Sequence, residues 1–135
     1  MVRHKPNKSG PVPQPCPLEY SLKLLAGAWT PQIIWYLQHE PRRFGDLKRD
    51  LGKVSAKVLT TRLRELEEKA VIVRKVMHTS PPTVEYSLTD LGRKMGPVLH
   101  TIADLGTEIQ KQMLDGKLGT RKTAPPKREA LEPAV

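Results

Sequence analysis

Leucine and isoleucine side chains recur every three or four residues in the first half of the chain, which is the spacing of one helix face. Glycine and proline residues divide this stretch into four short helices. Cys16 caps the first, which has Pro17 at its first position, and Thr30 caps the second. Gly52 ends the third, and Ser55 caps the fourth. The apolar faces comprise Leu18, Leu22, Leu25, Ile33, Ile34, Leu37, Leu47 and Leu51, and then a stripe in the fourth helix that we expect to be buried, Ala56, Leu59, Leu63, Leu66 and Ala70.

After the fourth helix, the period of the apolar positions changes from 3.6 to 2, which is typical of strands. Residues 71–78 (VIVRKVMH) are rich in β-branched side chains, and residues 83–88 alternate between polar and apolar side chains. Pro81 and Pro82 stand between the two runs, so we predict a β-hairpin with a stiffened tip. A further short extended piece is expected at Phe44.

Thr89 caps a long final helical region. Its apolar side chains follow one another at alternating spacings of four and three, close to a heptad repeat. Pro97 predicts a kink or a division near Gly96. Because the repeat extends beyond what a small domain can cover, we predict that it packs against a helix of a second subunit. Packing within the same chain remains an alternative for the half before Pro97. This apolar seam consists of Leu91, Met95, Val98, Ile102, Leu105, Ile109 and Met113.

These elements predict a mainly α-helical fold with a small β-hairpin (α+β), a winged helix-turn-helix that dimerises through its N- and C-terminal helices. A chain of 135 residues is long enough for one compact domain, which we assign to residues 16–113. Residues 1–15 and 114–135 are rich in proline and basic side chains and poor in apolar ones. We therefore expect two flexible tails, the first of them basic.

Positive charge is concentrated in residues 42–64, which hold eight basic and two acidic side chains, within a chain of net charge +9. Three glutamates follow at positions 65, 67 and 68, so the charge is confined to one stretch. Such a stretch favours a surface that binds phosphates, and the net charge favours nucleic acid or an anionic membrane surface as partner. No apolar run approaches the roughly 20 residues that cross a bilayer. The N-terminus lacks the apolar stretch of a secretory signal, and a single cysteine agrees with a reducing compartment, so we expect a cytoplasmic protein without membrane insertion.

Six short motifs occur together in residues 16–110 and make this part of the chain resemble the HxlR family of bacterial winged helix-turn-helix regulators. The resemblance implies a homodimeric, sequence-specific DNA-binding transcriptional regulator without a cofactor, and we expect a repressor. The chain departs from the family pattern at Ala28, Ala70, Thr83 and Leu105. Glycine is usual at position 70, and alanine tolerates a left-handed helix end less well. The motifs are Cys16-Pro17, Gly27-x-Trp29, Arg43-Phe44 with Leu47, Val54-Ser55-x-Lys57-x-Leu59-Thr60, Leu63-x-x-Leu66 and Pro82-x-Val84-Glu85-Tyr86-x-Leu88-Thr89-x-x-Gly92.

In such a dimer the two fourth helices enter successive major grooves about 34 to 36 Å apart, so we expect an inverted-repeat operator in double-stranded DNA. Side chains on the outward face of this helix are the candidates for contacts with base edges: Lys57, Thr61 and Arg64. The candidates for contacts with the DNA backbone, which position the protein without specifying sequence, are Arg43, Ser55, Thr60, Arg62, Lys75, His78 and Thr79.

Cys16 is the only candidate for covalent chemistry. The partial positive charge of a helix N-terminus favours a thiolate. The resemblance implies that this thiol senses oxidants or electrophiles, and the alternative is an inert, partly buried cysteine.

Other classes of protein find less support in the sequence. The four histidines lie in unrelated settings, and no spaced Cys/His cluster occurs, so the sequence predicts neither an enzyme nor a metal site. Charge alone is compatible with a nonspecific nucleic-acid-binding or nucleoid-associated protein. A winged helix used only for protein interactions is a third alternative, against which stands the polar and basic outward face of the fourth helix. No small-molecule effector is indicated.

Overall fold

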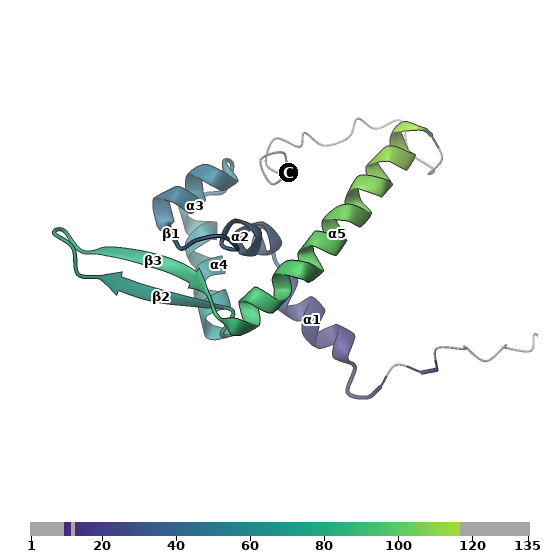
Figure 1. The fold of residues 1–135 in the computed structure, drawn as a ribbon, viewed down its shortest axis with the longest axis horizontal. Coiled ribbons are helices and arrows are strands. Elements are labelled where there is room, and N and C mark those ends of the chain that lie inside the picture. Colours follow the sequence, from purple (N-terminus) through teal and green to yellow (C-terminus); the bar gives the residue numbers. More distant parts are fainter. Residues whose placement is uncertain (1–9, 12, 117–135) are drawn as a thin grey trace, which may run out of the picture.

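The computed structural model describes residues 10, 11 and 13–116, so most of the predicted tails, 1–15 and 114–135, lies outside the described residues. The described part holds five helices and a small antiparallel sheet, which confirms the predicted mainly α-helical fold with a hairpin (Figure 1). The elements in chain order are α1 (Pro17–Leu25), α2 (Thr30–Tyr36), β1 (Arg42–Arg43), α3 (Phe44–Leu51), α4 (Ala56–Glu68), β2 (Ile72–Met77), β3 (Thr83–Leu88) and α5 (Asp90–Leu114).

The sheet has the strand order β1-β3-β2, and we call the β2–β3 hairpin the wing. The hairpin agrees with the sequence pattern, whereas β1 was not predicted as a strand. Arg42 lies opposite Tyr86 and Arg43 opposite Glu85, and Phe44 begins α3 instead of lying in an extended piece. A strand of two residues has no alternation that a sequence can reveal. It forms here because the outer edge of β3 offers unpaired backbone groups.

The hydrophobic core lies between α2, α3, α4, the base of the wing and the first half of α5. The inner face of α4 crosses it with three leucines, each at most 2% exposed. Burying a side chain of this size contributes roughly 1.5–3 kcal/mol, so this stripe is a main source of stability. The buried core residues are Ile33, Ile34, Leu37, Leu47, Leu51, Val54, Leu59, Leu63, Leu66, Val71, Ile72, Leu88, Met95 and Leu99.

Three predictions about helix ends are wrong. Ala56 and Ala70, assigned to the buried stripe of α4, are exposed, because one lies in the first turn and the other beyond the end of the helix. Thr30 is the first residue of α2 and is buried, so it is not the cap. Trp29 precedes the helix in a left-handed conformation with φ 73°.

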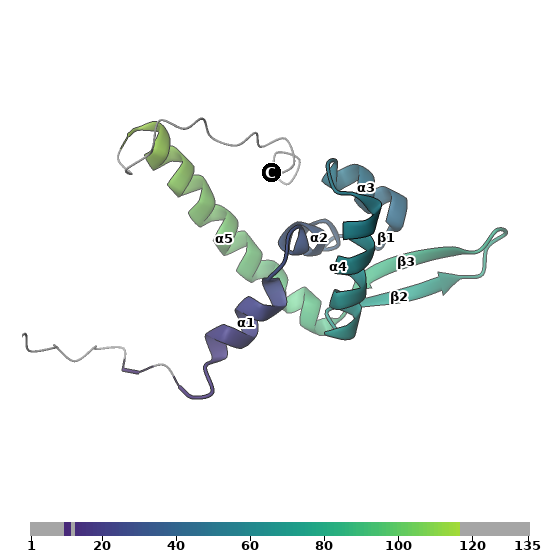
Figure 2. The same cartoon turned by 180° about the vertical axis from the view of Figure 1, so that it is seen from behind.

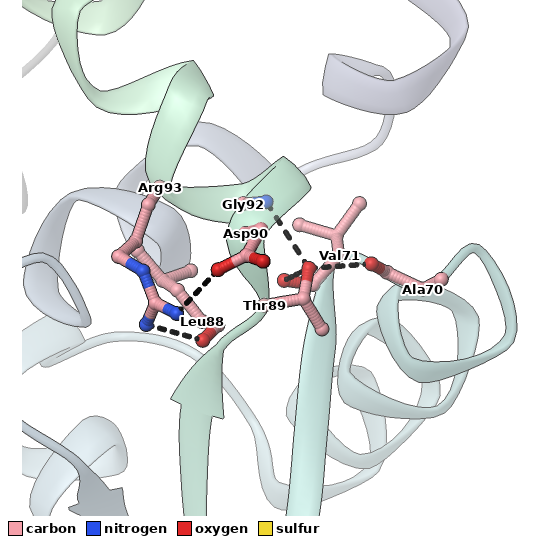
Figure 3. A network of polar contacts seen from close by, with 7 residues as sticks. All are labelled: Ala70, Val71, Leu88, Thr89, Asp90, Gly92 and Arg93. Carbon is pink, nitrogen blue, oxygen red and sulfur yellow. Dashed lines mark hydrogen bonds and ion pairs between the residues drawn. The ribbon is translucent and has the colours of Figure 1, made fainter.

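Ala70 adopts the left-handed conformation that the family resemblance implied, with φ 61°. It belongs to a junction of α4, β2 and α5 (Figure 3). The Thr89 hydroxyl lies 2.6 Å from the carbonyl oxygen of Ala70 and 3.0 Å from that of Val71, and accepts a hydrogen bond from the Gly92 N–H. A side chain at Gly92 would overlap the Val71 carbonyl oxygen. The base of the wing and the start of α5 are therefore held in close contact.

α5 is one helix through Pro97, so the proline does not divide it. Its buried positions are Gly92, Met95, Gly96 and Leu99, which pack on the core. Of the apolar seam, only Met95 is buried. The other six seam residues are 40–59% exposed. The wing and the outer half of α5 point away from the core in different directions (Figures 1 and 2).

Candidate nucleic-acid interface

α3 and α4 form a helix-turn-helix. Gly52 ends α3 with φ 78°, and its N–H donates to the Lys48 carbonyl oxygen at 3.0 Å. Val54 is buried in the turn and fixes it to the core. The Ser55 hydroxyl oxygen then accepts a hydrogen bond from the Val58 N–H at 3.1 Å, as the sequence predicted. Residues 55–57 are exposed, so the first turn of α4 is open to solvent.

The outward face of α4 carries Lys57, Thr61 and Arg64, which we call the outer stripe. All three are exposed, and their spacing of four and three residues places them on one side of the helix, opposite the buried leucines. Within the described residues, the Lys57 and Arg64 side chains form no hydrogen bond or ion pair. The three donors of the lysine and the five of the arginine are therefore available to a ligand.

The hydroxyl groups along α4 differ in what they offer a ligand. The Thr60 hydroxyl donates to the Ala56 carbonyl oxygen at 2.8 Å, and the Thr61 hydroxyl donates to that of Lys57 at 3.0 Å. Since each hydroxyl has one proton, both threonines present only an acceptor and a methyl group in this arrangement. Ser55 instead uses its oxygen as an acceptor, so its O–H remains able to donate to a phosphate.

Arg62 differs from the other predicted DNA contacts because its guanidinium is bound within the chain. Its Nε donates to the Ala28 carbonyl oxygen at 2.8 Å, and its NH1 donates to a Glu65 carboxylate oxygen at 2.7 Å. The Arg62 side chain is only 23% exposed. These two bonds use two of its five N–H groups and hold the guanidinium against the chain.

The sheet brings two predicted contacts together. Arg43 on β1 and Lys75 on β2 both lie opposite Glu85 on β3, so the three side chains form one row across the same face. Arg42 belongs to the other face and pairs with Asp50 at 3.5 Å. The row leaves one net positive charge along the side of the wing.

His78 and Thr79 lie at the tip of the wing and are exposed. The Thr79 hydroxyl donates to the Pro81 carbonyl oxygen at 2.7 Å and lies 3.3 Å from the Thr83 hydroxyl oxygen. These contacts hold the tip in shape. Of the two residues, His78 is the one whose side chain is open to a ligand in the described structure.

A buried polar group lies near the Arg42–Asp50 pair. The Tyr36 hydroxyl is buried without a hydrogen-bond partner among the described residues. Burial raises the pKa of Tyr36 above its ordinary value, and the nearby negative charge of Asp50 raises it further. The tyrosine therefore stays neutral at physiological pH and leaves the charge beside β1 to the arginine–aspartate pair.

Sequence reasoning missed part of the positive surface. A shallow hollow on α3 is lined by Gly45, Lys48, Arg49 and Gly52, next to the helix-turn-helix turn. Arg49 pairs with Asp46, whereas the Lys48 side chain is exposed. The adjacent basic residues at 48 and 49 within the charged stretch were the signal for this extension.

Cys16 caps α1 and is partly buried, as a free thiol. Its backbone carbonyl oxygen accepts the Glu19 N–H at 3.2 Å. The chain thus places its thiol at the N-terminal end of a nine-residue helix, about 40 residues before the outer stripe in the sequence and on a separate element.

Among the described residues, no three His, Cys, Asp or Glu side chains gather in a way that could hold a metal ion. The helices described here include none with the length and apolar character needed to cross a membrane.

The helix-turn-helix, the wing and the outer stripe together define a winged helix-turn-helix protein of the DNA-binding type. The chain belongs to the HxlR-like helix-turn-helix family, whose profile matches residues 24–114. A relative from Bacillus subtilis, YybR, named an uncharacterized HTH-type transcriptional regulator, is 35% identical over 110 residues, which cover 82% of this chain and 83% of YybR. The family and its named relatives are transcriptional regulators, a class of proteins that are not enzymes.

Two solved structures are similar in both fold and sequence. The redox regulator HypR in its reduced form superposes with a TM-score of 0.67 at 32% identity, over 73% of this chain and 97% of HypR. Diamide-treated YodB from Bacillus subtilis superposes with a TM-score of 0.60 at 31% identity, over 69% of this chain and 93% of YodB. The predicted family and the winged helix-turn-helix fold are thereby confirmed, whereas dimerisation through the terminal helices stays a prediction.

Proposed function

We propose that this chain is a sequence-specific, homodimeric repressor that reads an inverted-repeat operator with the outer stripe of α4. The proposal rests above all on one observation: Lys57 and Arg64 are exposed on a capped helix and have no partner within the described chain. Unpaired cations held on a rigid helix suit the major groove, where a bidentate contact from arginine to guanine distinguishes base pairs. As a transcriptional regulator, the protein would act in the cytoplasm, in contact with the chromosome.

The proposed roles follow from the donors that each side chain offers. Arg64 and Lys57 donate to base edges, and Thr61 presents its methyl group or accepts a hydrogen bond. Ser55, Arg43, Lys75 and His78 contact phosphates and position α4 without reading sequence. Thr60 and Thr79 can join the phosphate contacts only after their hydroxyls rotate away from internal acceptors, so we assign them smaller contributions. Arg62 is assigned a different role below.

The proposed dimer uses the apolar seam of α5 together with α1. The seam residues beyond Met95 are exposed in the single chain, and so are Leu18 and Leu22 on α1, at 61% and 64%. Exposed large apolar side chains in this number are typical of an interface between subunits. Repetition along one helix at heptad spacing favours a second helix as the partner. A symmetric pair would present two copies of α4 to one duplex.

The experiment that tests this function is the selection of bound duplexes from a random library, followed by titration of the selected sequence and of random DNA at the same salt concentration. A regulator should bind its operator at least about 10³-fold more tightly than random DNA. Equal affinity for both would instead support the alternative, a nonspecific nucleic-acid-binding protein.

Cys16 is proposed as the sensor of the regulator. The thiol lies at the N-terminal cap of α1, and α1 belongs to the proposed dimer interface. Oxidation, alkylation or a disulfide between the two Cys16 thiols, formed by a two-electron oxidant with loss of two protons, would alter how the subunits meet. HypR, which is 32% identical to this chain, is named a redox regulator, and this similarity supports a sensing role for Cys16.

Cys16→Ser is expected to bind the operator as tightly as the wild type under reducing conditions. Its operator affinity should not change after treatment with oxidants or electrophiles. The reason is that serine keeps the size of the side chain but cannot be oxidised or alkylated under these conditions. Operator affinity before and after treatment with peroxide or diamide measures this. A serine variant that responds as strongly as the wild type would eliminate Cys16 as the sensor.

A further inference from the structure

Two basic side chains, one on α4 and one directly after it, form hydrogen bonds with the N-terminal part of the chain. Besides the Arg62–Ala28 bond, the Lys69 ammonium, just beyond the end of α4, donates to the Lys23 carbonyl oxygen at 3.2 Å. One bond ends on the last turn of α1 and the other on the connection between α1 and α2. The second half of α4 is therefore bound at two points to the segment that carries α1.

α1 has few other attachments to the domain. None of its nine residues is buried, and only Leu24 and Leu25 pack partly against the core. The rest of its apolar face, including Leu18 and Leu22, is exposed. With so little burial, the polar bonds from α4 have a large share in setting the direction of α1.

The Arg62 contact is closely fitted. Glu65, one turn along α4, holds the other end of the guanidinium at 2.7 Å. Gly27 has φ 105°, and a Cβ atom there would lie 3.0 Å from the Arg62 Nε. The chain therefore needs glycine at this position both for its backbone conformation and for the approach of the arginine.

We propose that Arg62 and Lys69 are positioning residues that fix the angle between α1 and α4 and transmit a displacement of α1 to the DNA-reading helix. The inference rests on the proposed function, because it concerns how α4 is aimed at an operator. Arg62 then acts without touching DNA. A change at the Cys16 end of α1 would reach α4 through these two bonds.

Both donors are charged, and hydrogen bonds from charged donors contribute more than neutral ones. Without Arg62, the Ala28 carbonyl oxygen would lose its charged donor. A guanidinium with two fixed acceptors also holds a direction, which a single flexible contact does not.

The test begins with Arg62→Gln in the free, full-length protein. Amide hydrogen exchange in residues 23–30 should accelerate by about tenfold, as the loss of a charge-assisted hydrogen bond implies. Arg64→Gln is the matched control, since it removes the same charge from the same helix without an internal partner. It should leave exchange in residues 23–30 unchanged. Unaltered exchange in Arg62→Gln would overturn the proposal.

DNA binding gives the second readout. Arg62→Gln should lose about tenfold in affinity for the full inverted repeat, keep the affinity for a single half-site, and keep the salt dependence of the wild type. A phosphate contact would instead lower half-site affinity and reduce the salt slope by about 0.9, which would refute the positioning role.

Gly27→Ala places a Cβ atom close to Arg62 and so disturbs the same contact without removing a charge. It should reproduce the faster exchange and the loss of operator affinity. Lys69→Met tests the second bond in the same way and serves if Arg62→Gln does not fold. The exchange measurement does not depend on DNA. A wild type without operator preference would therefore refute the proposed function, whereas normal exchange in these variants would refute the coupling alone.

Discussion

Ile102→Glu is expected to convert a dimer into a monomer and to lower operator affinity by at least about 100-fold. Ile102 lies in the middle of the exposed seam and is 48% exposed in the single chain, so a carboxylate there does not disturb the core. In the dimer, however, two charges would meet within an apolar interface, where unpaired charges are costly. Without the dimer, the two copies of α4 bind as independent units and lose the roughly 10²–10⁴-fold gain of linked binding.

Sedimentation equilibrium and titration with operator DNA measure the two effects. Thr107→Glu is the matched control, because residue 107 lies on α5 opposite the seam and is exposed. It adds the same charge to the same helix and should leave both mass and affinity unchanged. An Ile102→Glu protein that remains dimeric with full affinity would show that α5 is not the interface.

Arg64→Ala is expected to weaken operator binding by about 10- to 100-fold while leaving affinity for random DNA within about twofold, since a bidentate contact to a base contributes roughly 1–3 kcal/mol of discrimination. The exposed Arg64 guanidinium has no partner within the described chain, so its replacement should not alter stability. The base pair that Arg64 reads should also become variable in sequences selected by the variant protein.

Lys75→Ala gives the contrasting result. Loss of a phosphate contact weakens binding to all duplexes alike and reduces the salt slope by about 0.9. Lys111→Ala, an exposed position in the last turn of α5, controls for the change in net charge and should have little effect. If Arg64→Ala and Lys75→Ala lowered specific and random affinity equally, the proposed division between reading and positioning would be wrong.

The regular part of the fold could be predicted because its signals are periodic. Leucines at positions 59, 63 and 66 recur at helical spacing after a serine cap, and both the stripe and the cap are as predicted. The prediction of burial is wrong at the two ends of this stripe, Ala56 and Ala70, because a small side chain at a helix end has little contact area. The left-handed conformation at Ala70 was implied only by the family resemblance, in which glycine is usual.

The remaining features depend on contacts between distant parts of the chain. β1 is too short to have a pattern and is defined by its pairing with β3. Arg62 looks like any basic residue of a DNA-binding helix, and its acceptor lies 34 residues earlier in the sequence. The exposure of Lys57 and Arg64 could be predicted from helix geometry alone, whereas the absence of internal partners within the described residues depends on how the whole chain folds.

We propose that one capped helix, presented twice by a symmetric pair, reads sequence in duplex DNA. Selection of bound fragments from a random library tests this through the symmetry of the recovered sequences. We expect an inverted repeat whose half-sites are centred about 10–10.5 base pairs apart, or a multiple of that distance. Recovery of a single unpaired motif, or of no common sequence, would contradict it.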